Sequence, residues 1–166
     1  MDLWIRSDSE RTVGGVIAVV AILLPWDVTY IADIAGGSLL YVRFPLFEFQ
    51  YAMGIQTAPT VVVRLATAAA DLHATGPLAP AYQAALAGAA IAIIAAILGL
   101  SLLVTDAGTG ATRIVRLLGV LVAASGVAFF VAWVMVLTRG APGIDLPLGA
   151  IVTPILGAVL VVAERR

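Results

Sequence analysis

Cysteine is absent from the 166 residues, which excludes disulfides, thiolate metal sites and cysteine nucleophiles. Lysine is absent too, and the nine basic residues are all arginine, with a formal net charge of −1. Because a phosphate-binding face needs a cluster of basic residues, we expect no nucleic-acid partner. His73 is the single histidine, so one chain cannot form a bis-histidine haem site. We expect no cofactor and no metal.

Charged residues are scarce as well, at 11% of the chain, whereas an average soluble domain is about one-quarter charged. Hydrophobic residues make up 62%, and the mean hydropathy is +1.10. The segment Ala84–Val104 contains no charged side chain. As a helix it would reach roughly 31 Å, about the thickness of the hydrocarbon layer of a bilayer. We therefore predict that this segment is a transmembrane helix.

Three further apolar segments predict a single all-α membrane domain over residues 1–166, a bundle of four transmembrane helices. The expected spans are residues 8–26, 81–104, 114–137 and 146–163. Residues 27–80 then form one long outer loop between the first two spans. Within this loop, Leu39–Met53 is rich in aromatic residues and split by Pro45, which favours two short strands or one extended segment. Pro59–Thr75 is predicted as an amphipathic helix that lies either at the membrane interface or on the strands of the loop.

Small residues recur at spacings of four and three along the second span, where close packing in lipid requires them. This helix-packing seam consists of Ala85, Gly88, Ala92, Ala95 and Gly99. We interpret the seam as internal packing, and association of several copies into a homo-oligomer remains the alternative.

The arginines indicate an orientation in the cell membrane. Six of them belong to the termini and the turn between the second and third spans, against three on the opposite side. By the positive-inside rule, both termini of this multi-pass protein are expected in the cytoplasm and the long loop outside.

No motif in the sequence has the residue types and spacing of a known catalytic or binding site. The central parts of the spans lack ionisable residues, which argues against ion-coupled transport. A small passive channel lined by hydroxyl groups remains an alternative. A membrane-embedded accessory or processing enzyme is a second alternative, with a site assembled from residues of the outer loop: Asp27, Asp33, Glu48, Asp71 and His73. His73 is more simply interpreted as a surface residue near the end of a helix.

The outer loop also contains a group of aromatic and charged residues. We predict an interaction surface for a partner protein or the cell envelope here, and its candidate residues are Arg43, Phe44, Phe47, Glu48, Phe49 and Tyr51. The alternative for the aromatic residues is contact with the membrane or with the core of the loop itself. Arg43, Glu48, Arg64 and Asp71 are expected to form ion pairs that fix the loop to the helices.

Three short motifs resemble a family of small haloarchaeal membrane proteins of unknown function, some encoded near the archaeosortase gene. They are Leu23–Val28 (LLPWDV), Val42–Leu46 (VRFPL) and Leu146–Gly149 (LPLG). The long loop between the first two spans also resembles the layout of claudins, although the W-G-L-W stretch and cysteine pair of that family are missing. The first resemblance implies a membrane protein without an assigned activity, and so without functional residues to transfer.

The sequence therefore predicts an integral membrane protein that is not an enzyme. Its partners are expected to be the lipid bilayer and, through the outer loop, another membrane or envelope protein.

Overall fold

The fold contains both helices and a sheet. The computed structural model describes residues 7–104, 111–140 and 143–162. Along the chain the elements are α1 (Ser7–Leu23), β1 (Asp27–Ile34), β2 (Gly37–Arg43), β3 (Phe47–Met53), β4 (Val61–Leu65), α2 (Ala66–Leu72), α3 (Ala79–Val104), α4 (Ala111–Arg139), β5 (Ile144–Leu146) and α5 (Leu148–Val162).

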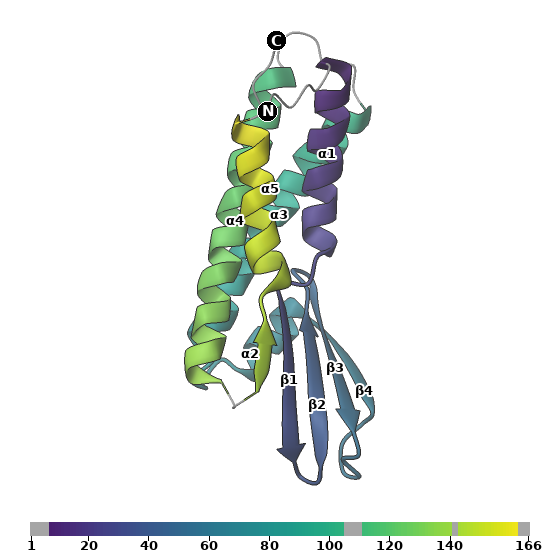
Figure 1. The fold of residues 1–166 in the computed structure, drawn as a ribbon. Coiled ribbons are helices and arrows are strands. Elements are labelled where there is room, and N and C mark those ends of the chain that lie inside the picture. The colour runs from purple at the N-terminus through teal and green to yellow at the C-terminus, as the bar shows by residue number, and fades with distance from the viewer. Residues whose placement is uncertain (1–6, 105–110, 141–142, 163–166) are drawn as a thin grey trace.

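The prediction of an all-α fold is wrong, because the strands form one antiparallel sheet in the order β4-β3-β2-β1-β5. Four of these strands come from the long loop, and β5 comes from the segment just before α5. The sheet lies at one end of the long helices, with its strands running in the same general direction as the helix axes (Figure 1). Strand β1 follows α1 and strand β5 precedes α5, so both helices are continued by strands of one sheet.

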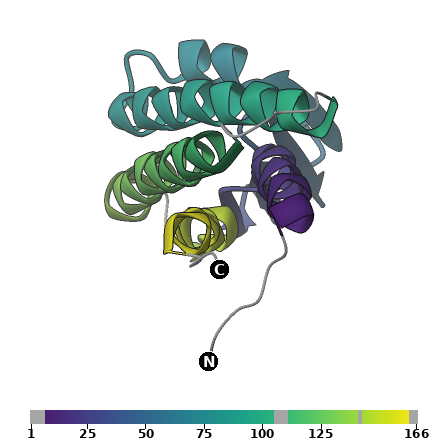
Figure 2. The same cartoon turned by 90° about the horizontal axis from the view of Figure 1, so that it is seen from above.

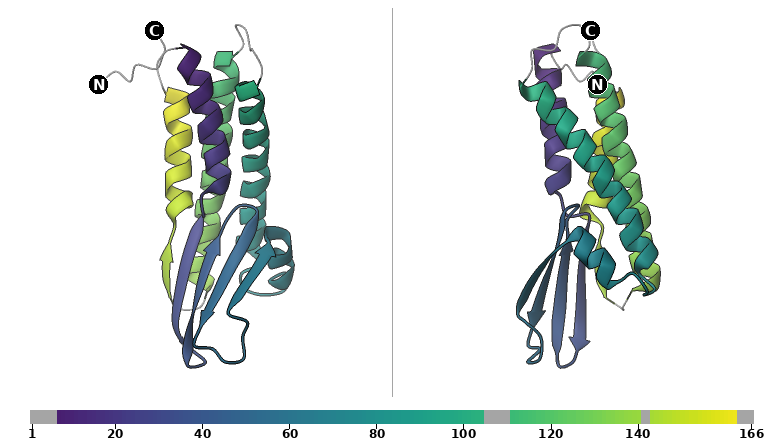
Figure 3. Two further views of the ribbon diagram at one scale, coloured as in Figure 1. Left: turned by 90° about the vertical axis from the view of Figure 1, so that its right-hand side faces the viewer. Right: turned by 180° about the vertical axis from the view of Figure 1, so that it is seen from behind.

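The prediction of four transmembrane helices is also wrong by length. Within the described residues, only Ala79–Val104 and Arg113–Arg139 are long and apolar enough to cross a membrane. At 1.5 Å per residue, α3 and α4 reach about 39 Å and 44 Å, whereas α1 and α5 reach only about 26 Å and 22 Å. The excess length of α3 and α4 extends beside the sheet (Figure 3).

The loop is more ordered than predicted. The two strands expected within Leu39–Met53 are confirmed as β2 and β3, which pair on either side of Pro45. The helix expected over Pro59–Thr75 is wrong in its first half. Val61–Leu65 forms strand β4, because β-branched side chains favour extended backbone. Only Ala66–Leu72 is helical. Most of the turn expected between the second and third spans, residues 105–110, lies outside the described residues.

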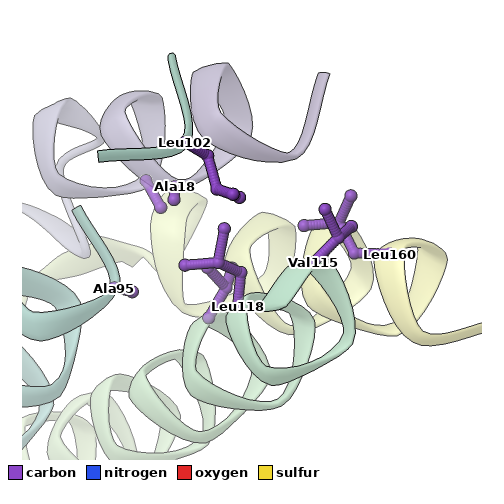
Figure 4. Close-up of a cluster of buried hydrophobic side chains, with 8 residues drawn as sticks. Ala18, Ala95, Leu102, Val115, Leu118 and Leu160 are labelled. Carbon is purple, nitrogen blue, oxygen red and sulfur yellow. The ribbon is translucent and has the colours of Figure 1, made fainter. Parts of the chain in front are cut away.

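The helices pack around a common core when viewed along their axes (Figure 2). In Figure 4, Leu118 of α4 points into the space between α1 and α5, near Ala18 and Leu160. A second buried cluster lies closer to the sheet and includes Trp26, whose ring stacks on Phe129 of α4 with centroids 6.1 Å apart.

The helix-packing seam predicted on α3 is buried along its whole length, from Ala85 to Gly99. A Cβ atom on Gly99 would lie 2.8 Å from Cβ of Ala18 in α1, and one on Gly88 would lie 2.9 Å from the ring of Phe129 in α4. The small residues therefore let α3 approach α1 and α4 within this chain.

Candidate functional site

Four charged residues form a row across the face of the sheet that turns toward the helices. Cross-strand pairing sets Asp27 opposite Arg43, Arg43 opposite Glu48, and Glu48 opposite Arg64. Residues directly opposite each other share a face, so the four charges alternate in sign across β1, β2, β3 and β4. We call this face, which also carries Thr29, Tyr41 and Gln50, the inner face.

Arg43 is the centre of the row and is only 5% exposed. Its Nη1 donates to Oδ2 of Asp27 and, at 2.6 Å, to Oγ1 of Thr29. Its Nε donates to Oε2 of Glu48 at 3.1 Å. The guanidinium also lies 4.9 Å from the ring centre of Tyr41, within the range of a cation–π contact.

Helix α3 joins this network through Tyr82. The Tyr82 hydroxyl donates to Oε2 of Glu48 at 2.5 Å and accepts from Nε of Arg43 at 3.3 Å. On its other side, the Tyr82 ring stacks on His73, with centroids 4.6 Å apart. The contact between sheet and helix is therefore polar at its centre and aromatic at its margin.

Burial sets the electrostatics of the group. It raises the pKa of Asp27 above its usual value, and this outweighs the opposite effect of the Arg43 guanidinium. Burial acts to lower the pKa of Arg43, but Tyr82, Asp27 and Glu48 together hold it above its usual value. Arg43 therefore stays charged, and each of the two buried carboxylates lies against it.

A pocket of about 10 Å³ opens beside Glu48, between the β2–β3 turn and α3. Trp26, Arg43 and Tyr82 line it together with apolar side chains. A space of this size holds about one water molecule. This pocket is thus far too small for an organic substrate. The charged row acts as a structural centre, because its hydrogen bonds to Tyr82 fix the sheet to α3.

The opposite face of the sheet, which we call the outer face, is apolar. Its side chains alternate with those of the inner face along every strand. They are Val28, Tyr30, Leu40, Val42, Phe47, Phe49, Tyr51, Met53, Val61, Val63, Leu65, Ile144 and Leu146, with Ser38 at one end. No charged residue occurs among these paired positions. The sheet thus buries its charges and exposes its apolar side chains.

The candidate interaction surface of the sequence is divided between the two faces. Arg43 and Glu48 are buried on the inner face, whereas Phe47, Phe49 and Tyr51 lie on the outer face. Phe44 lies in the turn between β2 and β3, where its ring stacks on Phe47 at 4.5 Å. The expected ion pairs of Glu48 with Arg43 and Arg64 are present, at 3.1 Å and 3.8 Å.

The residues considered for an enzyme site are not brought together as a group. Asp27 and Glu48 both contact Arg43, but Asp33 lies six residues farther along β1, about 20 Å from Asp27 by strand rise. Asp71 is exposed on α2. His73, interpreted from the sequence as a surface residue, is half-buried against Tyr82.

The three sequence motifs meet where the sheet joins the helices. The Gly149 amide donates to the carbonyl of Pro25 at 2.8 Å, and the Trp26 amide donates to the carbonyl of Arg43 at 2.8 Å. Sequence reasoning missed Tyr82 and Thr29 as members of the site. Tyr82 is 39 residues from Arg43, and a tyrosine near the start of an apolar helix gives no signal of its own.

Comparison with known proteins gives a family without an assigned activity. No curated protein matches the sequence. The match to the family covers residues 3–165, which is nearly the whole chain. The chain therefore belongs to DUF7549, a family of unknown function.

Proposed function

We propose that the chain is an integral membrane protein whose two longest helices, α3 and α4, cross the lipid and hold the sheet outside it, as a platform that contacts another protein. The location is supported by the exposure of the two longest helices. In their most apolar 18-residue windows, only 39% of the α3 residues and 33% of the α4 residues are buried. A core helix of a soluble protein buries most of its apolar side chains. Here fewer than half of the residues are buried, and large apolar side chains such as Ile97 and Phe130 are exposed, as lipid-facing side chains are.

The arginines support an orientation with the sheet outside the cell. Arg11, Arg113 and Arg116 lie at the end of the helices away from the sheet, and three more arginines directly precede α1 or closely follow α5 in the sequence: Arg6, Arg165 and Arg166. The sheet end has three, and two of these, Arg43 and Arg64, face the carboxylates of Asp27 and Glu48. The positive-inside rule then puts the end of α3 and α4 that lies away from the sheet in the cytoplasm.

The observation that carries the contact function is the outer face of the sheet. Apolar patches of this extent on a protein surface mark sites of interaction. The inner face fixes the sheet rigidly against α3, so the outer face is presented as a stable surface rather than a flexible loop.

The absence of cysteine allows a direct test of the location. Gln56→Cys places a thiol in the exposed β3–β4 loop, and Arg113→Cys places one near the start of α4 at the other end. A membrane-impermeant maleimide applied to intact cells should label the first variant only. Ile97→Cys is the matched control, because Ile97 is 61% exposed in the chain but lies within α3. This thiol should stay unlabelled also in opened membranes. Labelling of Ile97→Cys, or recovery of the protein without detergent, would overturn the location.

A photo-crosslinking amino acid tests the contact. At Tyr30 on the outer face it should form an adduct with another polypeptide in native membranes, whereas at Gln50 on the inner face it should not. Absence of any adduct from Tyr30 would overturn the contact function and leave the location intact.

A further inference from the structure

We infer that the polypeptide that covers the outer face is a second copy of this chain, which makes the sheet the centre of a two-fold symmetric dimer. This inference rests on the proposed function and names the partner of the same surface. Three features of the molecule favour a second copy: the direction of the strands, the charge of the face, and its extent.

The direction of the strands excludes the bilayer as the cover. They run along the helix axes (Figure 1), so the outer face stands upright on the membrane and cannot lie flat on lipid. Two copies in one membrane have parallel helix axes. A two-fold axis along the membrane normal brings their outer faces together with the strands aligned, as in face-to-face sheet packing at a spacing of about 10 Å.

The charge of the outer face suits self-association. In a two-fold contact the same face is used by both copies, and a side chain near the axis lies opposite the identical side chain of the other copy. A charged side chain near the axis would therefore lie against a like charge. The outer face has no charged side chain at its paired positions, because Asp27, Arg43 and Glu48 all lie on the inner face and pair there.

The extent of the patch matches a stable contact. Five strands with about five residues each give a sheet face of roughly 20 by 15 Å. Helix α1 lies above this face on the same side (Figure 3, left), and it packs on α3 and α4 behind it. Its exposed Val16, Val20 and Leu23 are spaced four and three residues apart, so they add an apolar strip of about 10 Å along α1. The side chains that project from this face add accessible surface beyond its outline, toward the roughly 800 Å² per partner of a standard interface.

The symmetry predicts which residues face each other. Strand β2 is the middle strand of the five, so it lies on the axis and opposes β2 of the second copy. Strand β4 of one copy opposes β5 of the other. Val63 and Leu146 belong to the same cross-strand row, through Phe49, Val42 and Val28. Val63 of one copy should therefore lie near Leu146 of the other.

Crosslinking with a short bismaleimide in native membranes tests this arrangement. Leu40→Cys on β2 should yield a species of twice the chain mass, and the neighbouring inner-face variant Leu39→Cys should not. Val63→Cys and Leu146→Cys should each stay monomeric alone and crosslink when the two variants are expressed together. Within one chain these positions are four strand spacings apart, about 19 Å, too far for the reagent.

A charge on the axis provides an independent measurement. Leu40→Glu should turn the detergent-solubilised dimer into a monomer in light scattering, whereas Leu40→Met should leave it dimeric. Leu40 is only half-buried, so the glutamate is tolerated in the single chain. A Leu40→Cys adduct of any other mass, or a monomeric wild-type protein, would overturn the dimer. An adduct of another mass would still support the proposed contact function, while labelling of Ile97→Cys would overturn the membrane location itself.

Discussion

The hydroxyl of Tyr82 donates a 2.5 Å hydrogen bond to Oε2 of Glu48, and this bond joins α3 to β3 across 34 positions of the sequence. Both residues are buried, and the same carboxylate oxygen accepts from Nε of Arg43. The sheet is thus attached to the helices by hydrogen bonds between buried polar groups. Such bonds are costly to break, because a buried acceptor without a donor loses its solvation without compensation.

Replacing Tyr82 by phenylalanine should therefore weaken the attachment of the sheet. We expect Tyr82→Phe to lower the free energy of unfolding by about 1–3 kcal/mol, because Glu48 keeps only the Arg43 donor on that oxygen. Thermal unfolding of the detergent-solubilised protein measures this loss. Tyr30→Phe is the matched control, since Tyr30 lies on the outer face and should change stability little. Equal losses for the two variants would contradict the structural role of the Tyr82 hydroxyl.

The two arginines of the charged row should differ strongly. Arg43→Met leaves the carboxylates of Asp27 and Glu48 buried without their cation, and we expect a loss of about 3–5 kcal/mol. Arg64 is more exposed, and its Nη1 is 3.8 Å from Oε1 of Glu48, so Arg64→Met should cost less than about 1 kcal/mol. Unfolding measured side by side in one detergent tests the difference. If Arg64→Met lost more unfolding free energy than Arg43→Met, Arg43 would not be the centre of the charged row.

The long helices could be predicted from the sequence because their signal is local. The uncharged run to Val104 located α3 to within two residues, since its start was expected at residue 81 and it begins at Ala79. Strand β5 could not be found in this way, because its three residues are too short for any periodicity. Strand β1 does alternate, but its polar positions Asp27 and Thr29 face inward. The usual rule that apolar side chains mark the buried face therefore fails there.

Part of the site could be predicted from the sequence, again because its signal is local. Arg43 and Glu48 lie five residues apart on either side of Pro45, so a hairpin that pairs them could be anticipated. The pairing of Arg43 with Asp27 spans 16 residues and that with Tyr82 spans 39. These contacts depend on the strand order and on where α3 crosses the sheet, which local patterns do not determine. The β-branched run Val61–Val63 was the one signal for β4 that the helix prediction overlooked.

The stacking of His73 on Tyr82 predicts a dependence of stability on pH. Burial lowers the pKa of His73 below its usual 6.5. As the pH drops through 6.5, His73 becomes protonated in the unfolded chain before it does so in the folded chain. The free energy of unfolding therefore falls between pH 6.5 and the lower pKa of His73 in the folded protein. His73→Phe keeps an aromatic ring on Tyr82 and should lack this part of the decline. Unfolding midpoints of both proteins over this pH range test the prediction. Parallel curves would contradict it.

The close approach of α4 and α5 makes Gly157 intolerant of any side chain. A Cβ atom there would lie 2.6 Å from the carbonyl oxygen of Gly119 and would also overlap the backbone of Ala123. Because backbone atoms of a packed helix cannot move aside as a flexible side chain can, we expect Gly157→Val to cost at least about 1–3 kcal/mol. Ala158→Val is the matched control, since Ala158 is exposed on the next position of α5. Valine there loses helix propensity relative to alanine, whereas valine in place of glycine gains a few tenths of a kcal/mol, so propensity alone would make the Gly157 variant the more stable one. Thermal unfolding in detergent should separate the two variants, and similar midpoints would mean that α4 and α5 do not meet at this glycine.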